Sequence, residues 1–62
     1  MGMIPYEMVI YWSVDDQLFI VEVPALPGCM ADGRTYQEAI LNVETVALEW
    51  LETAKELGRA IP

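Results

Sequence analysis

The most constraining feature of this sequence is a long amphipathic helix pattern that occupies its C-terminal part. At about 100° per residue, the pattern places one set of apolar side chains on a single stripe. The set is Tyr36, Ile40, Val43, Ala47, Trp50, Ala54 and Leu57, with Ala39, Val46 and Leu51 at its margins. Thr35 and Glu38 form a capping box that predicts the start, and Gly58 supplies a left-handed stop. A helix over residues 36–57 spans about 33 Å, so residues 1–35 must provide the apolar surface that covers its stripe.

Two strand patterns and a weaker third precede this helix. Residues 6–14 and 18–23 are rich in β-branched and aromatic residues, and Asp15-Asp16-Gln17 between them predicts the turn of a hairpin. Pro24 and Pro27 exclude a central strand through residues 24–28. A third short strand is predicted over residues 29–31, ended by a turn at Asp32-Gly33. The sequence therefore predicts an α+β fold of order β-β-β-α, with a three-stranded antiparallel sheet and the helix packed on one face.

Strand alternation indicates which side of the sheet meets the helix. Phe19, Val21 and Val23 form the better core face of the second strand, because Glu22 lies on the other side. Neither face of the first strand is clearly polar, although a sheet that faces water on one side should alternate more cleanly. We therefore expect another chain to cover the second face. Apolar residues on this face, or Leu41 and Leu48 on the helix, would supply the contacts with a second copy or with a partner protein. The candidates for self-association are Val9, Tyr11 and Ile20.

Size and charge exclude several classes of function. The chain has 62 residues, one domain at most, with ten acidic and three basic residues, no histidine and a net charge of −7. Binding to nucleic-acid phosphates or anionic membranes is disfavoured because both need clustered cations. A domain this small is marginally stable alone, which favours a partner chain or self-association. One cysteine and the lack of a long apolar run indicate a reducing cytoplasm.

The candidate chemical groups do not indicate catalysis. The Asp15-Asp16 pair would need further carboxylates to hold a metal ion, and the sequence does not fix its distance from Glu22. A plain turn is the favoured interpretation. Cys29 lacks a histidine base and is interpreted as a buried packing residue. We expect no cofactor, no metal and no enzymatic activity.

The solvent side of the helix carries two further groups of residues. Glu38, Glu49, Glu52 and Glu56 fall on one arc, which is either an ordinary solvated face or a docking surface for a basic partner. Leu41 and Leu48 lie seven residues apart beside this arc, opposite the core stripe. Leucines rimmed by glutamates are also typical of the centre of a protein contact.

Three motifs in order resemble the HicB-like antitoxin family. They are V-P-x-L-P-G-C at residues 23–29, G-x-T-x-x-E-A at 33–39 and G-x-x-I-P at 58–62. The resemblance covers residues 6–62 and implies a partial RNase H-like fold without nuclease activity. It also implies a type II antitoxin that covers the catalytic surface of HicA, a small basic mRNA-cleaving toxin, and that forms dimers or larger oligomers.

Longer members of this family continue into another strand and a DNA-binding domain, which residues 1–62 do not contain. The expected function is therefore toxin neutralisation by a single HicB-like domain, and the alternative is a stand-alone oligomerising module without a toxin. A metal nuclease on the same frame is a third hypothesis. The candidate partner-binding residues are Asp15, Asp16, Glu22, Glu38, Leu41, Leu48, Glu49 and Glu52.

Overall fold

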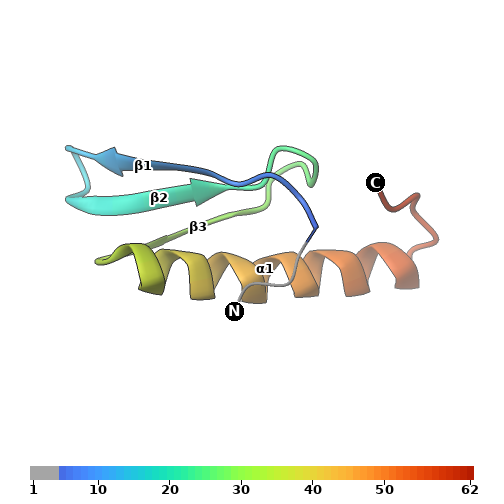
Figure 1. The fold of residues 1–62 in the computed structure, drawn as a ribbon. Helices are drawn as coiled ribbons and strands as arrows, with labels where there is room; N and C mark the ends of the chain where they lie inside the picture. Colours follow the sequence, from blue (N-terminus) through green and yellow to red (C-terminus); the bar gives the residue numbers. More distant parts are fainter. Residues whose placement is uncertain (1–4) are drawn as a thin grey trace.

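The computed structural model describes residues 5–62, which form three strands followed by one helix (Figure 1). The strands are β1 (Val9–Ser13), β2 (Leu18–Glu22) and β3 (Met30–Gly33), and the helix is α1 (Tyr36–Glu56). The sheet order is β1-β2-β3 with both pairs antiparallel. This confirms the predicted α+β fold and its β-β-β-α order. Within the described range, α1 lacks the length of apolar sequence needed to cross a membrane.

The first two strands form the predicted hairpin, although β1 is shorter than the predicted segment over residues 6–14. Its register pairs Val9 with Glu22 at one end and Ser13 with Leu18 at the other. The turn is held by the Ser13 hydroxyl, which donates to Asp16 Oδ2 at 3.0 Å and accepts from the Asp16 N–H at 3.3 Å. Gln17 adopts a positive φ of 55° as the chain returns to β2. Short polar side chains therefore make this turn, as their types predict.

The third strand ends later than predicted. β3 continues through Asp32 and Gly33, which pair with Ile20 and Phe19 respectively, so the predicted turn at Asp32-Gly33 is wrong. Gly33 has another role, because a Cβ built there would lie 2.4 Å from the backbone nitrogen of Ala39. The glycine thus allows the start of α1 to approach the sheet closely, and it does not act as a turn residue.

Both ends of α1 are closed by local hydrogen bonds. The Thr35 hydroxyl accepts from the Glu38 N–H at 3.1 Å, as predicted, while Glu38 Oε1 accepts from the Arg34 N–H at 2.9 Å, one residue before the usual capping-box partner. At the other end Gly58 has φ 72°, and the N–H groups of Gly58 and Arg59 donate to the carbonyls of Lys55 and Ala54. This is a Schellman motif, which confirms Gly58 as the stop.

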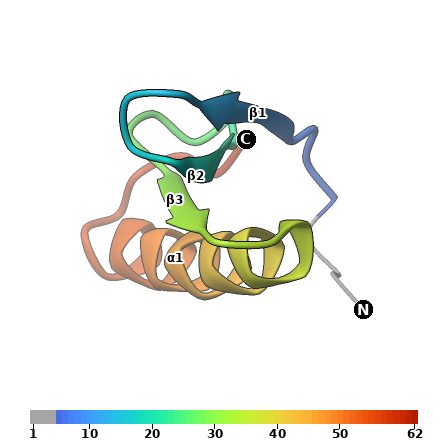
Figure 2. The same cartoon turned by 90° about the vertical axis from the view of Figure 1, so that its left-hand side faces the viewer.

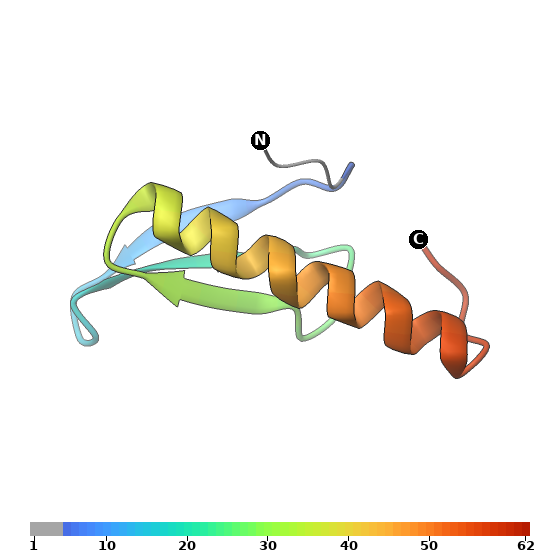
Figure 3. The same ribbon diagram turned by 90° about the horizontal axis from the view of Figure 1, so that it is seen from below.

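The core lies between α1 and the β2–β3 side of the sheet, while β1 lies farther from the helix (Figures 2 and 3). Its buried residues include Val21 and Val23 from β2 and the following loop, and Ala39, Val43 and Ala47 from α1. Alanines on the helix face allow close packing against the sheet. Tyr36 and Leu57, predicted on the core stripe, are instead 55% and 62% exposed. They lie at the two ends of the helix, and its C-terminal end projects beyond the sheet (Figure 1).

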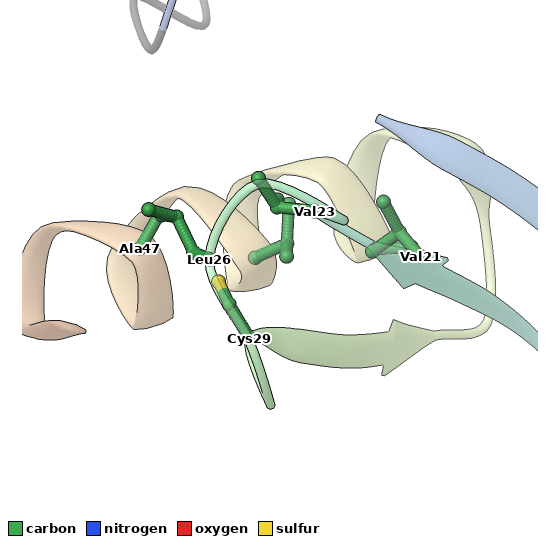
Figure 4. Packing of buried hydrophobic residues seen from close by; sticks show 7 residues of the cluster. Val21, Val23, Leu26, Cys29 and Ala47 are labelled. Carbon is green, nitrogen blue, oxygen red and sulfur yellow. The ribbon is translucent and has the colours of Figure 1, made fainter. Parts of the chain in front are cut away.

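The loop between β2 and β3 closes the core beyond the ends of these strands (Figure 4). Three backbone hydrogen bonds link Val23, Leu26 and Cys29 to one another, and all three side chains are buried. Trp50 from α1 donates its Nε1–H to the Pro27 carbonyl at 2.9 Å. The V-P-x-L-P-G-C motif is therefore a packing element, which confirms Cys29 as a buried packing residue.

Candidate partner-binding surfaces

One face of the sheet has no second layer among the described residues, and we call it the open sheet face. It is the side away from α1 (Figure 1). The strand register places on it Val9, Tyr11, Ser13, Leu18, Ile20, Glu22, Met30 and Asp32. Val9, Tyr11 and Met30 are between 43% and 48% exposed, whereas Ile20 in the central strand is only 8% exposed. The three predicted self-association residues thus share one face, but Val9 and Tyr11 offer more accessible surface there than Ile20.

Tyr11 and Glu22 form a hydrogen-bonded pair on this face. The Tyr11 hydroxyl donates to Glu22 Oε2 at 2.9 Å across β1 and β2. This bond favours the protonated phenol and, with partial burial and the negative charges of Glu22 and Asp16, raises the pKa of Tyr11 above its usual value. The structure therefore joins a predicted self-association residue to a predicted partner-binding acid.

The acidic turn lies at the other end of the hairpin from Glu22. Asp15 and Asp16 are exposed between β1 and β2, whereas Glu22 pairs with Val9 at the opposite end of the ladder. These three carboxylates do not converge on one point. In residues 5–62 there is no group of three or more potential ligands that could hold a metal ion.

The outer side of α1 forms the second surface, which we call the outer helix surface. Its members are Glu38, Leu41, Leu48, Glu49, Glu52 and Glu56, and all of them are exposed. Leu41 and Leu48 are 63% and 58% exposed, which agrees with their predicted place opposite the core stripe. Glu38 is partly engaged in capping the helix. Glu44 is half-buried and does not belong to this surface.

The two surfaces point in opposite directions, because α1 covers one side of the sheet and its buried residues face that sheet (Figure 1). A single rigid partner cannot lie flat on both. The structure therefore separates the candidate residues into those of the open sheet face, those of the outer helix surface, and the pair Asp15 and Asp16 in the hairpin turn.

Two small hollows lie on the surface of residues 5–62. One, of about 160 Å³, is lined by residues of the β2–β3 loop, and the other, of about 260 Å³, lies beside Trp50 and Arg59. Sites for small organic ligands usually enclose roughly 300–1,000 Å³. Both hollows are therefore smaller than a usual site of that kind.

Sequence reasoning missed several contacts that shape these surfaces. Leu26 is fully buried although it lies in a loop. The Tyr6 hydroxyl donates to the Pro62 carbonyl at 2.6 Å and ties the two ends of the described chain together. The Asn42 side chain donates to the Asp32 carbonyl at 2.7 Å and covers a backbone acceptor of β3. These contacts join distant segments, and no local periodicity signals them.

Comparison with known proteins connects this fold to one family. Residues 6–62 match the model of a HicB-like antitoxin of bacterial toxin–antitoxin systems. UPF0150 protein Ta0767 of Thermoplasma acidophilum is 37% identical over 54 residues, which cover 87% of this chain and 78% of that protein. UPF0150 protein ssl0259 of Synechocystis is 39% identical over 57 residues, which cover 92% of this chain and 77% of that protein. No solved structure gave a significant match. With its three motifs and its β-β-β-α architecture, this chain belongs to the HicB-like antitoxin family.

Proposed function

We propose that this protein is the antitoxin of a HicA/HicB-type system, and that it neutralises a small basic mRNA-cleaving toxin by covering its active surface. The observation that carries the proposal is the family match over residues 6–62. The net charge of −7 supports it, because an inhibitor of a cationic protein gains from opposite charge. The proposed action is stoichiometric binding without catalysis.

We assign toxin binding to the outer helix surface. Leu41 and Leu48 provide exposed apolar area, and Glu49 and Glu52 lie beside them. An apolar centre with a charged rim is typical of protein interfaces. Negative charge at the rim accelerates association with a basic partner and disfavours acidic ones. Asp15, Asp16 and Glu22 form the alternative set of acidic contacts at the sheet.

Co-expression with the basic product of the neighbouring gene tests the proposal. The wild-type chain should restore growth in cells that express the toxin and should copurify with it. Leu41→Asp combined with Leu48→Asp should abolish both effects, because it places charge at the centre of the contact. The matched control is Asp15→Lys, an exposed change in the hairpin turn that should leave rescue intact. If the double variant restores growth and Asp15→Lys does not, toxin binding is assigned to the sheet instead of the outer helix surface.

A stand-alone oligomerising module is the second candidate function. The exposed apolar residues of the open sheet face favour self-association. A neighbouring gene that encodes a short basic protein supports the antitoxin. If no such gene is present and the chain forms a stable oligomer without a toxin, the module is supported. Self-association is compatible with both functions, because the outer helix surface lies on the other side of the molecule.

A further inference from the structure

The hollow at the β2–β3 loop lies beside the open sheet face and does not belong to the outer helix surface. Its volume is about 160 Å³, and a protein cavity of roughly 150 Å³ holds a molecule the size of benzene. The hollow therefore has room for one side chain of a partner. The residues that line it are Glu22, Val23, Pro24, Leu26, Pro27, Gly28, Cys29 and Met30.

The walls of this hollow are held in place by the fold itself. Three backbone hydrogen bonds of 2.8–3.0 Å join Val23, Leu26 and Cys29 to one another, and these buried side chains form the floor. From α1, the Trp50 side chain holds the Pro27 carbonyl at 2.9 Å. A proline ring also fixes its own backbone φ. A side chain that enters the hollow thus meets a preformed wall, so little ordering opposes its binding.

The lining combines apolar surface with one fixed acid. Glu22 supplies the charge, and its Oε2 accepts a 2.9 Å hydrogen bond from the Tyr11 hydroxyl. Met30 lies directly opposite Glu22 in the β2–β3 register. An apolar wall that ends at a carboxylate matches a lysine side chain, whose stem packs on apolar surface while its ammonium group stays at the polar rim.

Arginine fits this rim less well than lysine. The planar guanidinium favours both oxygens of a carboxylate, and Tyr11 already occupies Oε2 of Glu22. The ammonium of lysine is a compact charge that can approach Oε1 alone. The net charge of −7 further attracts a cationic chain. We propose that this hollow is a recognition pocket for one lysine side chain of a basic protein, with Glu22 as its counter-charge and Tyr11 as the positioning residue.

This inference goes beyond the proposed function and does not depend on it. Toxin binding is assigned to the outer helix surface, on the other side of the molecule, so a protein with its lysine in this hollow does not compete with the toxin. The chain has a lysine of its own, Lys55, in the last turn of α1. Occupation by a second copy is therefore one outcome that the test must separate.

The first test is an NMR titration of the isotope-labelled chain with N-acetyl-lysine N-methylamide, a lysine side chain with neutral ends. Amide shifts should concentrate at Glu22 and at residues 28–30 and should saturate. Glu22→Gln should weaken this binding about tenfold or more, because a hydrogen bond to a charged group is lost. The matched control is Glu49→Gln, which removes the same charge from the outer helix surface and should leave the binding unchanged. Far-UV circular dichroism checks that each variant is folded.

The second test compares probes and fills the pocket from within. The norleucine and arginine analogues of the probe should bind several-fold more weakly than the lysine compound. Met30→Lys should abolish probe binding, because it sets an ammonium group of the chain itself opposite Glu22. Equal binding of the arginine and lysine probes overturns the choice of lysine.

Three further results would overturn the pocket or its occupant. Shifts spread over all acidic positions, reduced equally by Glu22→Gln and Glu49→Gln, show general attraction without a pocket. A chain that self-associates and is dissociated by either Glu22→Gln or Lys55→Gln places a second copy in the hollow. Loss of toxin copurification in Glu22→Gln places the toxin there. Copurification that persists in this variant leaves toxin binding and the lysine pocket as separate interactions, as proposed.

Discussion

Tyr11 and Glu22 provide a measurable electrostatic pair on the open sheet face. The hydrogen bond between them raises the pKa of Tyr11, so the folded chain holds this proton more tightly than the unfolded chain. The pair therefore adds stability below the unfolded pKa of about 10. That contribution is lost as pH rises through the higher folded pKa.

Glu22→Gln should lower the pKa of Tyr11 toward its usual value, because a neutral amide no longer favours the protonated phenol. The measurement is a tyrosinate absorbance titration, with Tyr11→Phe used to subtract the signals of Tyr6 and Tyr36. The loss of stability above pH of about 10 should also become smaller. Glu49→Gln removes an equal charge from the exposed side of α1 and should leave the Tyr11 titration unchanged. Equal titrations in the wild type and Glu22→Gln would contradict the pairing.

Leu26 should be the most sensitive apolar position outside the strands and helix. Its side chain is fully buried between the β2–β3 loop and α1. Leu26→Ala should lower the free energy of unfolding by about 2–5 kcal/mol, a large share of the stability of a domain this small. Urea unfolding measures the change. Leu48→Ala, on the exposed helix side, should change it by less than about 0.5 kcal/mol, and equal losses would contradict this assignment.

At the scale of single residues, strand alternation and hydropathy correctly predicted that Val21 and Val23 lie in the core. They did not predict Leu26, because a loop between two prolines has no period from which a buried side can be assigned. Trp50 was correctly placed toward the core, but its hydrogen bond to Pro27 depends on where that loop folds back. Side chains in regular elements follow from local pattern, and side chains that close a loop follow from tertiary contact.

At the scale of elements, the caps of α1 were predictable because the capping interactions of Thr35, Glu38 and Gly58 involve only residues a few positions away in the sequence. The exposure of Tyr36 and Leu57 was not predictable from the sequence, because it depends on the length of the sheet that the helix crosses. The end of β3 was misplaced for a related reason. Asp32-Gly33 is a common turn pair, and only the position of Ala39 shows that the glycine instead makes room for the helix.

Gly33→Ala should therefore destabilise the junction between β3 and α1. Its new Cβ would lie 2.4 Å from Ala39 N and 2.8 Å from Glu38 C, and both are backbone atoms that cannot rotate away. We expect a loss of about 1–3 kcal/mol, typical of overpacking, in urea unfolding followed by far-UV circular dichroism.

Gly58→Ala is the comparison for this variant. Gly58 has φ 72° and no atom within 4 Å of a built Cβ, so its cost is confined to backbone conformation, about 1 kcal/mol. A Gly33→Ala chain as stable as the wild type would show that the helix start can move away from the sheet.

At the scale of the whole molecule, the sequence predicted the candidate residues but not how they are grouped. Alternation placed Val9, Tyr11 and Ile20 on one face, and helical spacing placed Leu41 and Leu48 on another. The opposition of these two surfaces required the packing of α1 on the sheet. The position of β1 at one edge of the described three-stranded sheet also follows from sheet order, which cannot be read from a hydropathy pattern.

Salt should act in opposite directions on self-association and on toxin binding. The −7 charge repels a second copy and attracts a basic toxin, and salt screens both effects as the Debye length falls below about 10 Å. Between about 0.05 and 0.5 M NaCl, the toxin association rate should fall and the dimer dissociation constant should also fall. Stopped-flow mixing and sedimentation equilibrium measure the two. Glu49→Gln combined with Glu52→Gln should flatten the salt dependence of toxin binding more than that of dimerisation, since the open sheet face lies away from these acids. If salt weakens both interactions alike, self-association is held by charge pairs and not by the apolar residues of the open sheet face.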